Sequence, residues 1–308
     1  MFQSPGECLP AEPGHSLHVE YNAVPPPRGS FMNPLRTALS RTLSLSVRGV
    51  RRLTGRTPRM ILTYHKVGHG PGRVQPEILE QQIRQAQAAG YEFVPVSRMS
   101  EWVKYGTNLP RRAVSLTFDD GLADTARVAG PILRRYGVAA TVFPVLSFLG
   151  GPRRYASEKA QAYLLAHDDD PRTVPYDFMT WDELDQWVEG GGEVGGHTLT
   201  HPFLGSADEA TGLAEIKACR RQLAARYGSP PRVFCYPYGD DSGQAGTWVR
   251  QAGFEAAVTS HHGIVRKDSN LHHLRRVPGA ETAGREFADL LAGVFLARQR
   301  LRKAFGRP

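Results

Sequence analysis

Cysteine is scarce in this chain of 308 residues, which has only Cys8, Cys219 and Cys235. An odd number of cysteines without close spacing does not indicate a disulfide framework. The chain also lacks any run of 18 or more apolar residues, which argues against a transmembrane helix. The first 30 residues are rich in proline, glycine and histidine and lack the apolar core of a secretory signal. Together these absences favour a reducing, cytoplasmic location.

Acidic residues are missing from residues 33 to 59, a segment that contains seven arginines. Its leucines and valines recur at spacings of three and four, so a helix there would carry an apolar stripe opposite most of the arginines. Such a helix suits the surface of an anionic membrane. Two alternatives stay open: the stripe packs on the folded domain, or the segment is an organellar transit peptide. Met32, just before it, is an alternative start.

Positive charge is concentrated at the two ends of the chain. The net charge of the whole chain is +8, while residues 33 to 59 carry +7 and residues 298 to 308 carry +5. The middle of the chain has no patch in which Lys and Arg alternate with aromatic residues. A nucleic-acid partner is therefore not expected. Anionic lipid is the better partner, in a peripheral contact at the inner membrane face.

The hydrophobic content of 41% is enough for one large core, and about 240 residues suit a single α/β barrel better than two domains. We therefore expect a basic extension over residues 1 to 57 and one domain over residues 58 to 308. Strand and helix patterns alternate in this domain, which predicts a parallel sheet. Strands are expected at 60–65, 93–96, 113–118, 139–146 and, last, 254–259; helices at 78–89, 124–136, 181–188, 207–227, 246–252 and 286–305. Residues 150 to 180 lose this periodicity and form a candidate substrate loop.

Two adjacent carboxylates, Asp119 and Asp120, follow the apolar strand predicted at residues 113 to 118 and precede Gly121. Adjacent side chains at the end of a strand point in different directions, so one carboxylate can hold a metal while the other moves a proton. Asp-Asp-Gly by itself is also a common surface turn. The interpretation therefore depends on what else in the chain could join this pair.

Two histidines, His197 and His201, lie four residues apart after another short strand-like run, and Pro202 follows them. This spacing places both rings on one side of a single turn, although histidines this close also occur on solvated surfaces. Two histidines and one carboxylate, each at the end of a strand, are a usual ligand set for a catalytic zinc or a similar divalent ion.

A third cluster, Tyr-Pro-Tyr-Gly at residues 236 to 239, ends a strand that starts near residue 233. Thr-Phe-Asp-Asp-Gly, His-Thr-x-x-His and Tyr-Pro-Tyr-Gly, in this order, resemble the motifs of the polysaccharide deacetylase family, the carbohydrate esterases with a NodB-homology domain. The resemblance covers roughly residues 58 to 278. It implies an α/β fold, a distorted (β/α)7 barrel, here with a basic N-terminal helix and a C-terminal helix. The active site of such a barrel lies at the C-terminal ends of its strands.

The resemblance implies a metal-dependent hydrolase that removes an N-acetyl or similar acyl group from an amino sugar of a polysaccharide or lipid-linked glycan. Asp120, His197 and His201 would hold the divalent ion, expected to be zinc, with cobalt and nickel as alternatives. Asp119 would be the general base. The resemblance also places a backbone N–H that binds the oxyanion at Tyr238.

The leaving amine needs a proton donor. In a subgroup that resembles the poly-N-acetylglucosamine deacetylases, the donor is a histidine in a Tyr-His pair at the end of the first strand, and Tyr64-His65 matches it. His65 is therefore preferred over His273, which lies in a Leu-His-His-Leu stretch that fits the wider family's Leu-x-His motif only loosely.

One position departs from the family pattern. Two residues before the motif proline, Pro237, the family usually has an arginine that orients the base, and this chain has Cys235. Either another residue orients Asp119 or none does.

Two other interpretations stay open. One is a non-catalytic glycan-binding relic. Such a relic usually loses a metal ligand or the base, but this chain keeps the three metal ligands Asp120, His197 and His201 and the base Asp119. The same fold also hosts deformylases and cyclic-amide hydrolases, which differ in substrate loops that this sequence does not let us interpret.

Overall fold

The computed structural model describes residues 57–70, 73–153, 176–279 and 284–297, all of which belong to one compact unit, residues 31–308. Most of the predicted basic helix at residues 33 to 59, most of the candidate substrate loop and residues 298–308 lie outside these ranges. The division at residue 57 therefore stays a prediction.

The domain is built on one parallel sheet. Seven strands follow one another in space in the order β7-β4-β3-β1-β10-β9-β8, and β2 pairs with the start of β3. The strands are β1 (Met60–Tyr64), β2 (Glu92–Phe93), β3 (Ala113–Asp120), β4 (Thr141–Pro144), β7 (Glu193–Val194), β8 (Val233–Cys235), β9 (Ala256–His262) and β10 (Leu274–Pro278). A separate antiparallel pair joins β5 (Pro152–Arg153) to β6 (Tyr176–Asp177).

The sheet curls until its two edges meet just beyond β7. Gly196 forms a bridge with Phe234 of β8, in which the Gly196 N–H donates to the Val233 carbonyl at 2.9 Å and the Cys235 N–H donates to the Gly196 carbonyl at 2.8 Å. The barrel is thus closed by one short contact, and the predicted distorted (β/α) barrel is confirmed.

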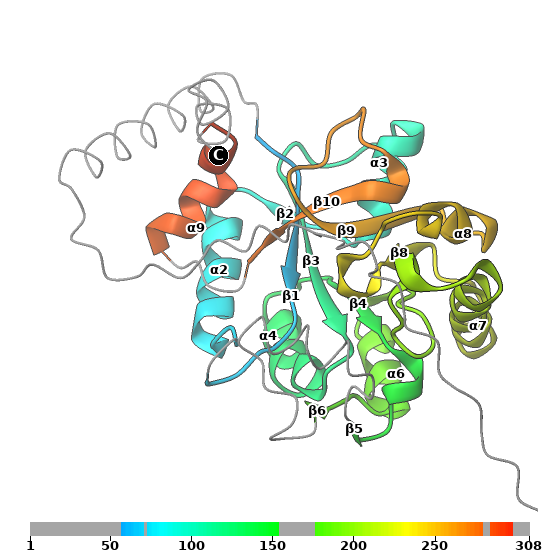
Figure 1. Ribbon diagram of the computed structural model, residues 1–308. Helices are drawn as coiled ribbons and strands as arrows, with labels where there is room; N and C mark the ends of the chain where they lie inside the picture. The colour runs from blue at the N-terminus through cyan, green and yellow to red at the C-terminus, as the bar shows by residue number, and fades with distance from the viewer. Residues whose placement is uncertain (1–56, 71–72, 154–175, 280–283, 298–308) are drawn as a thin grey trace, which may run out of the picture. The chain divides into compact units, whose positions relative to one another are not determined.

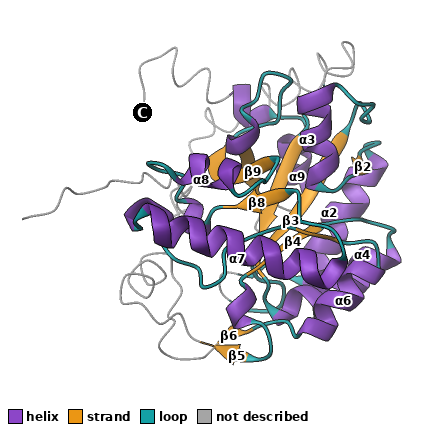
Figure 2. Ribbon diagram, turned by 90° about the vertical axis from the view of Figure 1, so that its right-hand side faces the viewer, coloured by secondary structure: helices purple, strands orange, loops and turns teal. Residues whose placement is uncertain are grey.

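Helices cover the outside of the sheet. They are α2 (Pro76–Ala88), α3 (Val96–Tyr105), α4 (Gly130–Arg135), α6 (Trp181–Glu189), α7 (Glu209–Tyr227), α8 (Ala245–Gln251) and α9 (Gly284–Leu291). Figure 1 shows α2 and α9 on one side of the strands and α7 and α8 on the other. In Figure 2, α7 crosses in front of β8 and β4. Most of these helices follow the predicted ranges, since their apolar residues recur with helical spacing.

Two sequence predictions were wrong. The run predicted as a strand at residues 93 to 96 contains only one residue of β2, Phe93. The chain then enters α3, which buries Val96, Met99 and Ser100 at helical spacing. The strand predicted to be the last, β9, is followed by β10, whose sequence LRRVP contains two charged residues. A hydrophobic pattern cannot identify such a strand, because one of the arginines is buried by a charge partner and not by apolar packing.

Alternating side chains divide the core into two layers. Leu62 of β1 and Leu116 of β3 pack against the covering helices, whereas Ile61 and Ala113 pack with residues of β4, β8, β9 and β10 inside the barrel. By the same alternation, the inner face of β3 ends on Asp119. The barrel interior is therefore apolar at the start of the strands and carries a carboxylate at their C-terminal end.

The closure of the barrel should not tolerate a side chain at Gly195, because a Cβ atom there would lie 2.2 Å from the Phe143 ring. We expect Gly195→Ala to lower the free energy of unfolding by roughly 1–3 kcal/mol through overpacking, measured by urea denaturation. Gly137→Ala is the control, because its Cβ would meet open space and only its left-handed φ of 62° opposes the change. A Gly195→Ala variant as stable as the native chain would contradict this account.

Candidate metal centre

Asp120 ends β3 in a conformation that few residues other than glycine adopt, with a φ of 68°. Gly121 follows with a φ of 75°, and a Cβ atom there would lie 2.9 Å from the Pro144 Cα. The Val145 N–H donates to the Asp120 carbonyl at 3.2 Å. This sharp turn points the two adjacent carboxylates in different directions, as the sequence predicts.

The two histidines lie on a tight turn that follows the barrel closure. Thr198 and His201 have φ values of 67° and 63°, and the His201 N–H donates to the Thr198 hydroxyl at 3.0 Å. Nδ1 of His197 lies 2.7 Å from the Cys235 carbonyl. Because a carbonyl oxygen only accepts, Nδ1 carries the proton in this contact, and Nε2 of a neutral His197 then presents its lone pair toward Asp120.

The three side chains meet at one point. Oδ1 of Asp120 lies 3.3 Å from Nε2 of His197 and 3.3 Å from Nε2 of His201, and the two Nε2 atoms are 3.2 Å apart. Ligands arranged tetrahedrally at about 2.0–2.1 Å from a zinc ion lie roughly 3.3 Å from one another. The donor types and their mutual spacing therefore both fit a divalent metal, and among the described residues this is the group that could hold one.

Asp119 is held by a residue that the sequence did not reveal. Nη1 and Nη2 of Arg276, in β10, donate to the two carboxylate oxygens at 2.7 Å each. Arg276 also donates from Nη1 to the Thr117 hydroxyl at 3.0 Å and from Nε to the Thr259 carbonyl at 2.9 Å. Its Nη2 lies 3.3 Å from the sulfur of Cys235, the residue found where the family usually has its arginine. An arginine from another strand thus binds the carboxylate.

Both members of this pair are buried, with 2% of the Arg276 side chain and 4% of the Asp119 side chain exposed. Burial alone raises the pKa of Asp119, but the charge of Arg276 and its hydrogen bonds outweigh burial, so the pKa lies below its ordinary value. Asp119 is therefore held as an ionised acceptor at neutral pH.

Only one of the two histidines proposed as proton donors lies beside these carboxylates. His65 follows β1, and its Nε2 lies 3.7 Å from Oδ2 of Asp119, with 48% of its side chain exposed. His273 instead contacts Asp241, with 2.7 Å between its Nδ1 and the carboxylate. Of the two candidates, His65 therefore lies beside Asp119 and is partly exposed, whereas His273 is paired with another carboxylate.

The third motif lies against the ligand group. Pro237 is buried in the short turn after β8, and Tyr238 follows it with a φ of 57°. The Tyr238 ring packs edge-on against His201, 4.3 Å between centroids, and stacks on Phe203 at 3.8 Å. The structure thus brings all seven residues predicted for the site to one end of the barrel.

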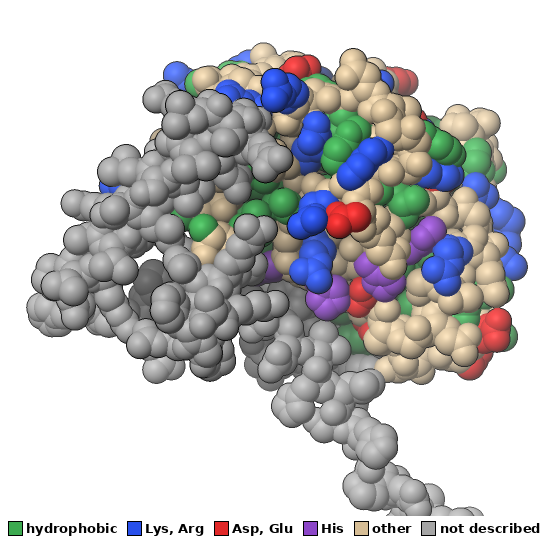
Figure 3. Space-filling model, turned by 90° about the horizontal axis from the view of Figure 1, so that it is seen from above, with side chains coloured by type: hydrophobic (Ala, Val, Ile, Leu, Met, Phe, Trp, Pro, Cys, Tyr) green, Lys and Arg blue, Asp and Glu red, His purple; other side chains and the backbone are tan. Residues whose placement is uncertain are grey.

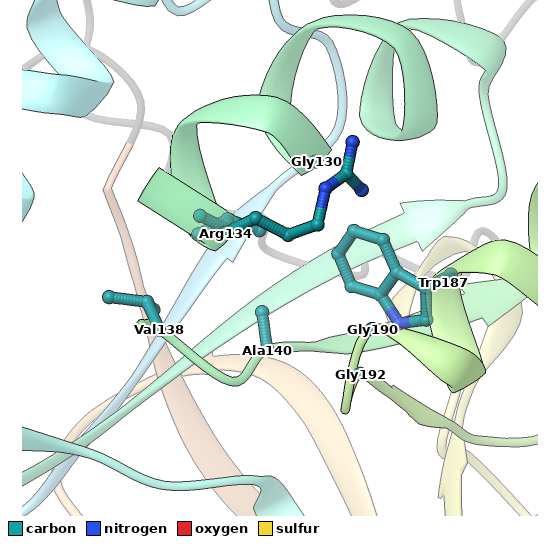
Figure 4. A pocket seen from close by; sticks show the side chains of 8 residues that line it. Gly130, Arg134, Val138, Ala140, Trp187, Gly190 and Gly192 are labelled. Atoms are coloured by element: carbon teal, nitrogen blue, oxygen red, sulfur yellow. The ribbon is translucent and has the colours of Figure 1, made fainter. Parts of the chain in front are cut away.

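A separate hollow lies between α4 and α6, where the lining includes Arg134 and Trp187 (Figure 4). Its walls are otherwise glycine and aliphatic side chains near the start of β4. The lining contains none of the predicted site residues, and it offers no pair of groups for acid–base chemistry.

The fold and the site together define an α/β barrel with a candidate metal centre at the C-terminal edge of its strands. Residues 106–257 match the family model described as polysaccharide deacetylase. The chain therefore contains a domain of the polysaccharide deacetylase family. The matched range includes Asp120, His197, His201 and Tyr238, whereas His65 and Arg276 lie outside it.

Known proteins resemble this chain at low identity. The Bacillus subtilis protein YxkH, named as a polysaccharide deacetylase, is 21% identical over 218 residues, 70% of each chain. The poly-β-1,6-N-acetyl-D-glucosamine N-deacetylase of Escherichia coli is 24% identical over 250 residues, 72% of this chain and 36% of its own length. Solved structures of the Streptococcus pyogenes deacetylase PplD and of IcaB from Ammonifex degensii are both 21% identical. The match to PplD covers 76% of this chain and 96% of PplD, with a TM-score of 0.62. The match to IcaB covers 77% of this chain and 97% of IcaB, with a TM-score of 0.63.

We expect Arg276→Ala to lower the free energy of unfolding by about 3–5 kcal/mol, because it leaves the Asp119 carboxylate buried without its partner. Arg275→Ala is the matched control, since the neighbouring arginine is exposed and its loss should change stability by no more than about 0.5 kcal/mol. Both variants are compared by urea denaturation. Equal stability of the two would show that the buried pair is not the constraint described here.

Proposed function

We propose that this chain is a metal-dependent N-deacylase that removes an acetyl or similar acyl group from an amino sugar of a glycan. The observation that carries the proposal is the meeting of Asp120, His197 and His201, with ligand atoms 3.2–3.3 Å apart, next to a buried carboxylate that is not part of the group. A metal site with an adjacent base is the arrangement that amide hydrolysis requires.

Asp120, His197 and His201 would hold the ion. Two nitrogen ligands and one oxygen suit zinc, and cobalt or nickel can take the same ligands. The ion would supply Lewis acidity, polarising the acyl carbonyl and lowering the pKa of a water molecule.

Asp119 would take the proton of the attacking water. Arg276 holds both of its oxygens at 2.7 Å and so keeps the carboxylate ionised and fixed in orientation. His65, 3.7 Å from Asp119 and half exposed, would give a proton to the leaving amine. The backbone N–H of Tyr238 would bind the oxyanion that develops on the acyl oxygen.

The substrate is proposed from the family and from one relative's name. The Escherichia coli relative is named for poly-β-1,6-N-acetyl-D-glucosamine, so an N-acetylglucosamine polymer is the first substrate to test. Formyl groups and lipid-linked amino sugars belong in the same test, because the residues at the metal site would serve any small acyl amide. A glycan-binding relic is the alternative, and it would bind these sugars without releasing acid.

The test is release of acetate and formate by zinc-loaded full-length protein from N-acetylglucosamine oligomers and lipid-linked amino sugars. We expect His65→Ala to lower kcat by roughly 10²–10⁴, the usual contribution of a general acid, and Asp119→Asn and chelation of the metal to abolish release. His273→Ala is the control and should leave kcat unchanged. Equal loss in the two histidine variants would remove His65 from the proposed role, and no release from any substrate would favour the relic.

We also propose that the opposite end of the barrel contacts an anionic membrane. Arg59 and Arg111 precede β1 and β3, whereas His65 and Asp119 lie at the other ends of these strands. The Arg59 guanidinium and the Lys267 ammonium lie 4.2 and 5.2 Å from the centroid of the Trp102 ring. Within the described part of the chain, Arg59, Arg111 and Lys267 form no ion pair with a carboxylate.

Further features support this contact. Tyr105, next to this cluster on α3, is 63% exposed and is the one large hydrophobic side chain so exposed among the described residues. The seven-arginine segment of the sequence ends at Arg59, and Figure 3 shows several Lys and Arg side chains on the face of the molecule seen from above. None of the described helices is long and apolar enough to cross a bilayer, so the contact would be peripheral, with the metal centre facing away from the lipid.

The contact predicts that a variant with Arg59→Ser, Arg111→Ser and Lys267→Ser binds phosphatidylglycerol vesicles at least tenfold more weakly than the native chain, because each basic residue contributes about 1 kcal/mol near an anionic surface. Arg84→Ser, Arg134→Ser and Arg221→Ser together form a charge-matched control on other exposed surfaces. Vesicle sedimentation measures both. If the two triple variants lose equal affinity, the binding reflects net charge and not this end of the barrel.

A further inference from the structure

A side chain of α7 contacts the turn that carries the two histidines. Glu215 lies about two turns into this helix, and its Oε2 accepts hydrogen bonds from the backbone N–H groups of Leu199 at 2.9 Å and Thr200 at 2.8 Å. Its other oxygen, Oε1, accepts from the Thr200 hydroxyl at 2.8 Å. One carboxylate thus binds three donors of the segment between His197 and His201.

This turn needs such a partner because its backbone is in an unfavourable conformation. Thr198 is β-branched and has a φ of 67°, and His201 has a φ of 63°. In the described part of the chain, the other non-glycine residues with positive φ are Asp120 and Tyr238. All four lie at the candidate metal centre. Such conformations persist only when the surrounding structure holds them in place.

Several contacts hold the turn, among them the Ser147 N–H, which donates to the Leu199 carbonyl at 2.9 Å. From inside, the Thr198 hydroxyl accepts from the His201 N–H at 3.0 Å. From outside, Glu215 holds the two intervening N–H groups. His197 has a further anchor, because its Nδ1 donates to the Cys235 carbonyl. The position of His201 relative to His197 therefore depends on the path of the turn, and that path depends on Glu215.

The contacts of Glu215 do not resemble those of an ordinary surface acid. Among the described residues no lysine or arginine forms an ion pair with it. Its charge instead faces two backbone N–H groups and one hydroxyl, which form short contacts to a carboxylate. A carboxylate that accepts successive N–H groups of a left-handed turn stabilises the turn itself.

We propose that Glu215 is a positioning residue that sets the spacing of the two imidazoles and hence the affinity of the site for a divalent metal. This inference rests on the metal site of the proposed function. Residues that orient metal ligands typically change metal affinity by 10–100-fold when they are replaced. The Nε2 atoms of His197 and His201 are 3.2 Å apart, so a small rotation of the turn would move one of them out of the ligand geometry.

The experiment measures the dissociation constants of Zn²⁺ and Co²⁺ from the metal-stripped full-length chain by competition with a chromophoric chelator. We expect Glu215→Ala to weaken both by about 10–100-fold. Glu215→Gln should bind nearly as well as the native chain, because the amide oxygen can accept both N–H groups and the amide nitrogen can donate to the Thr200 hydroxyl. Glu209→Ala is the control, since this exposed acid lies in the first turn of the same helix.

A second variant separates positioning from general damage to the fold. Thr200→Val removes one of the three hydrogen bonds and should cause a smaller loss of metal affinity than Glu215→Ala. Without metal, the Thr200→Val protein should melt at nearly the same temperature as the Glu209→Ala control. The visible absorption spectrum of bound Co²⁺ should change in Glu215→Ala and stay unchanged in Glu215→Gln.

Three results would overturn the inference. Native affinity in both Glu215→Ala and Thr200→Val would show that the turn holds the histidines without this carboxylate. Equal loss in Glu215→Gln and Glu215→Ala would show that the charge acts and not the hydrogen bonds. If the native chain itself binds neither ion, the proposed metal site fails and the role of Glu215 fails with it. If the native chain binds the ions and the variants bind them equally well, only the role of Glu215 fails.

Discussion

The buried contact between Asp119 and Arg276 is the constraint on which the interior of the barrel depends. Two charged side chains, each almost fully buried, are tolerated there because each satisfies the other in a bidentate contact and the arginine has further acceptors on Thr117 and Thr259. The contact joins β3 to β10, which lie on either side of β1. It therefore fixes the orientation of a carboxylate and the placement of a strand at the same time.

The C-terminal edge of the barrel concentrates unfavourable backbone conformations together with chemically active side chains. Asp120, Thr198, His201 and Tyr238 all have positive φ. Contacts from other elements hold these turns, such as the Val145 N–H on the Asp120 carbonyl and Glu215 on the turn that contains Thr198 and His201. This arrangement lets a carboxylate from β3 and two imidazoles from the segment after β7 approach within 3.3 Å of one another. The rest of the fold provides the stability that such conformations require.

The two ends of the strands differ in the kind of charge they present. At the C-terminal ends, the carboxylates of Asp119 and Asp120 are balanced by one arginine and by histidines. At the other end, the Arg59 guanidinium and the Lys267 ammonium lie beside the Trp102 ring, and neither forms an ion pair with a carboxylate of the described residues. An exposed tyrosine, Tyr105, lies on the same helix as Trp102. These two groups therefore lie at opposite ends of the same strands.

The sequence by itself determined the parallel α/β class, most helices, and the residues at the metal centre, because each follows a local apolar strand or turn pattern. It did not indicate α3, β10 or the partners of the active groups. Arg276 lies 157 residues from Asp119, and Glu215 lies about 15 residues beyond the turn that it holds. The spacing of apolar residues in a sequence indicates which face of a segment is buried, but it does not indicate which distant side chain that face contacts. That choice depends on strand register and helix packing, which only the tertiary structure decided.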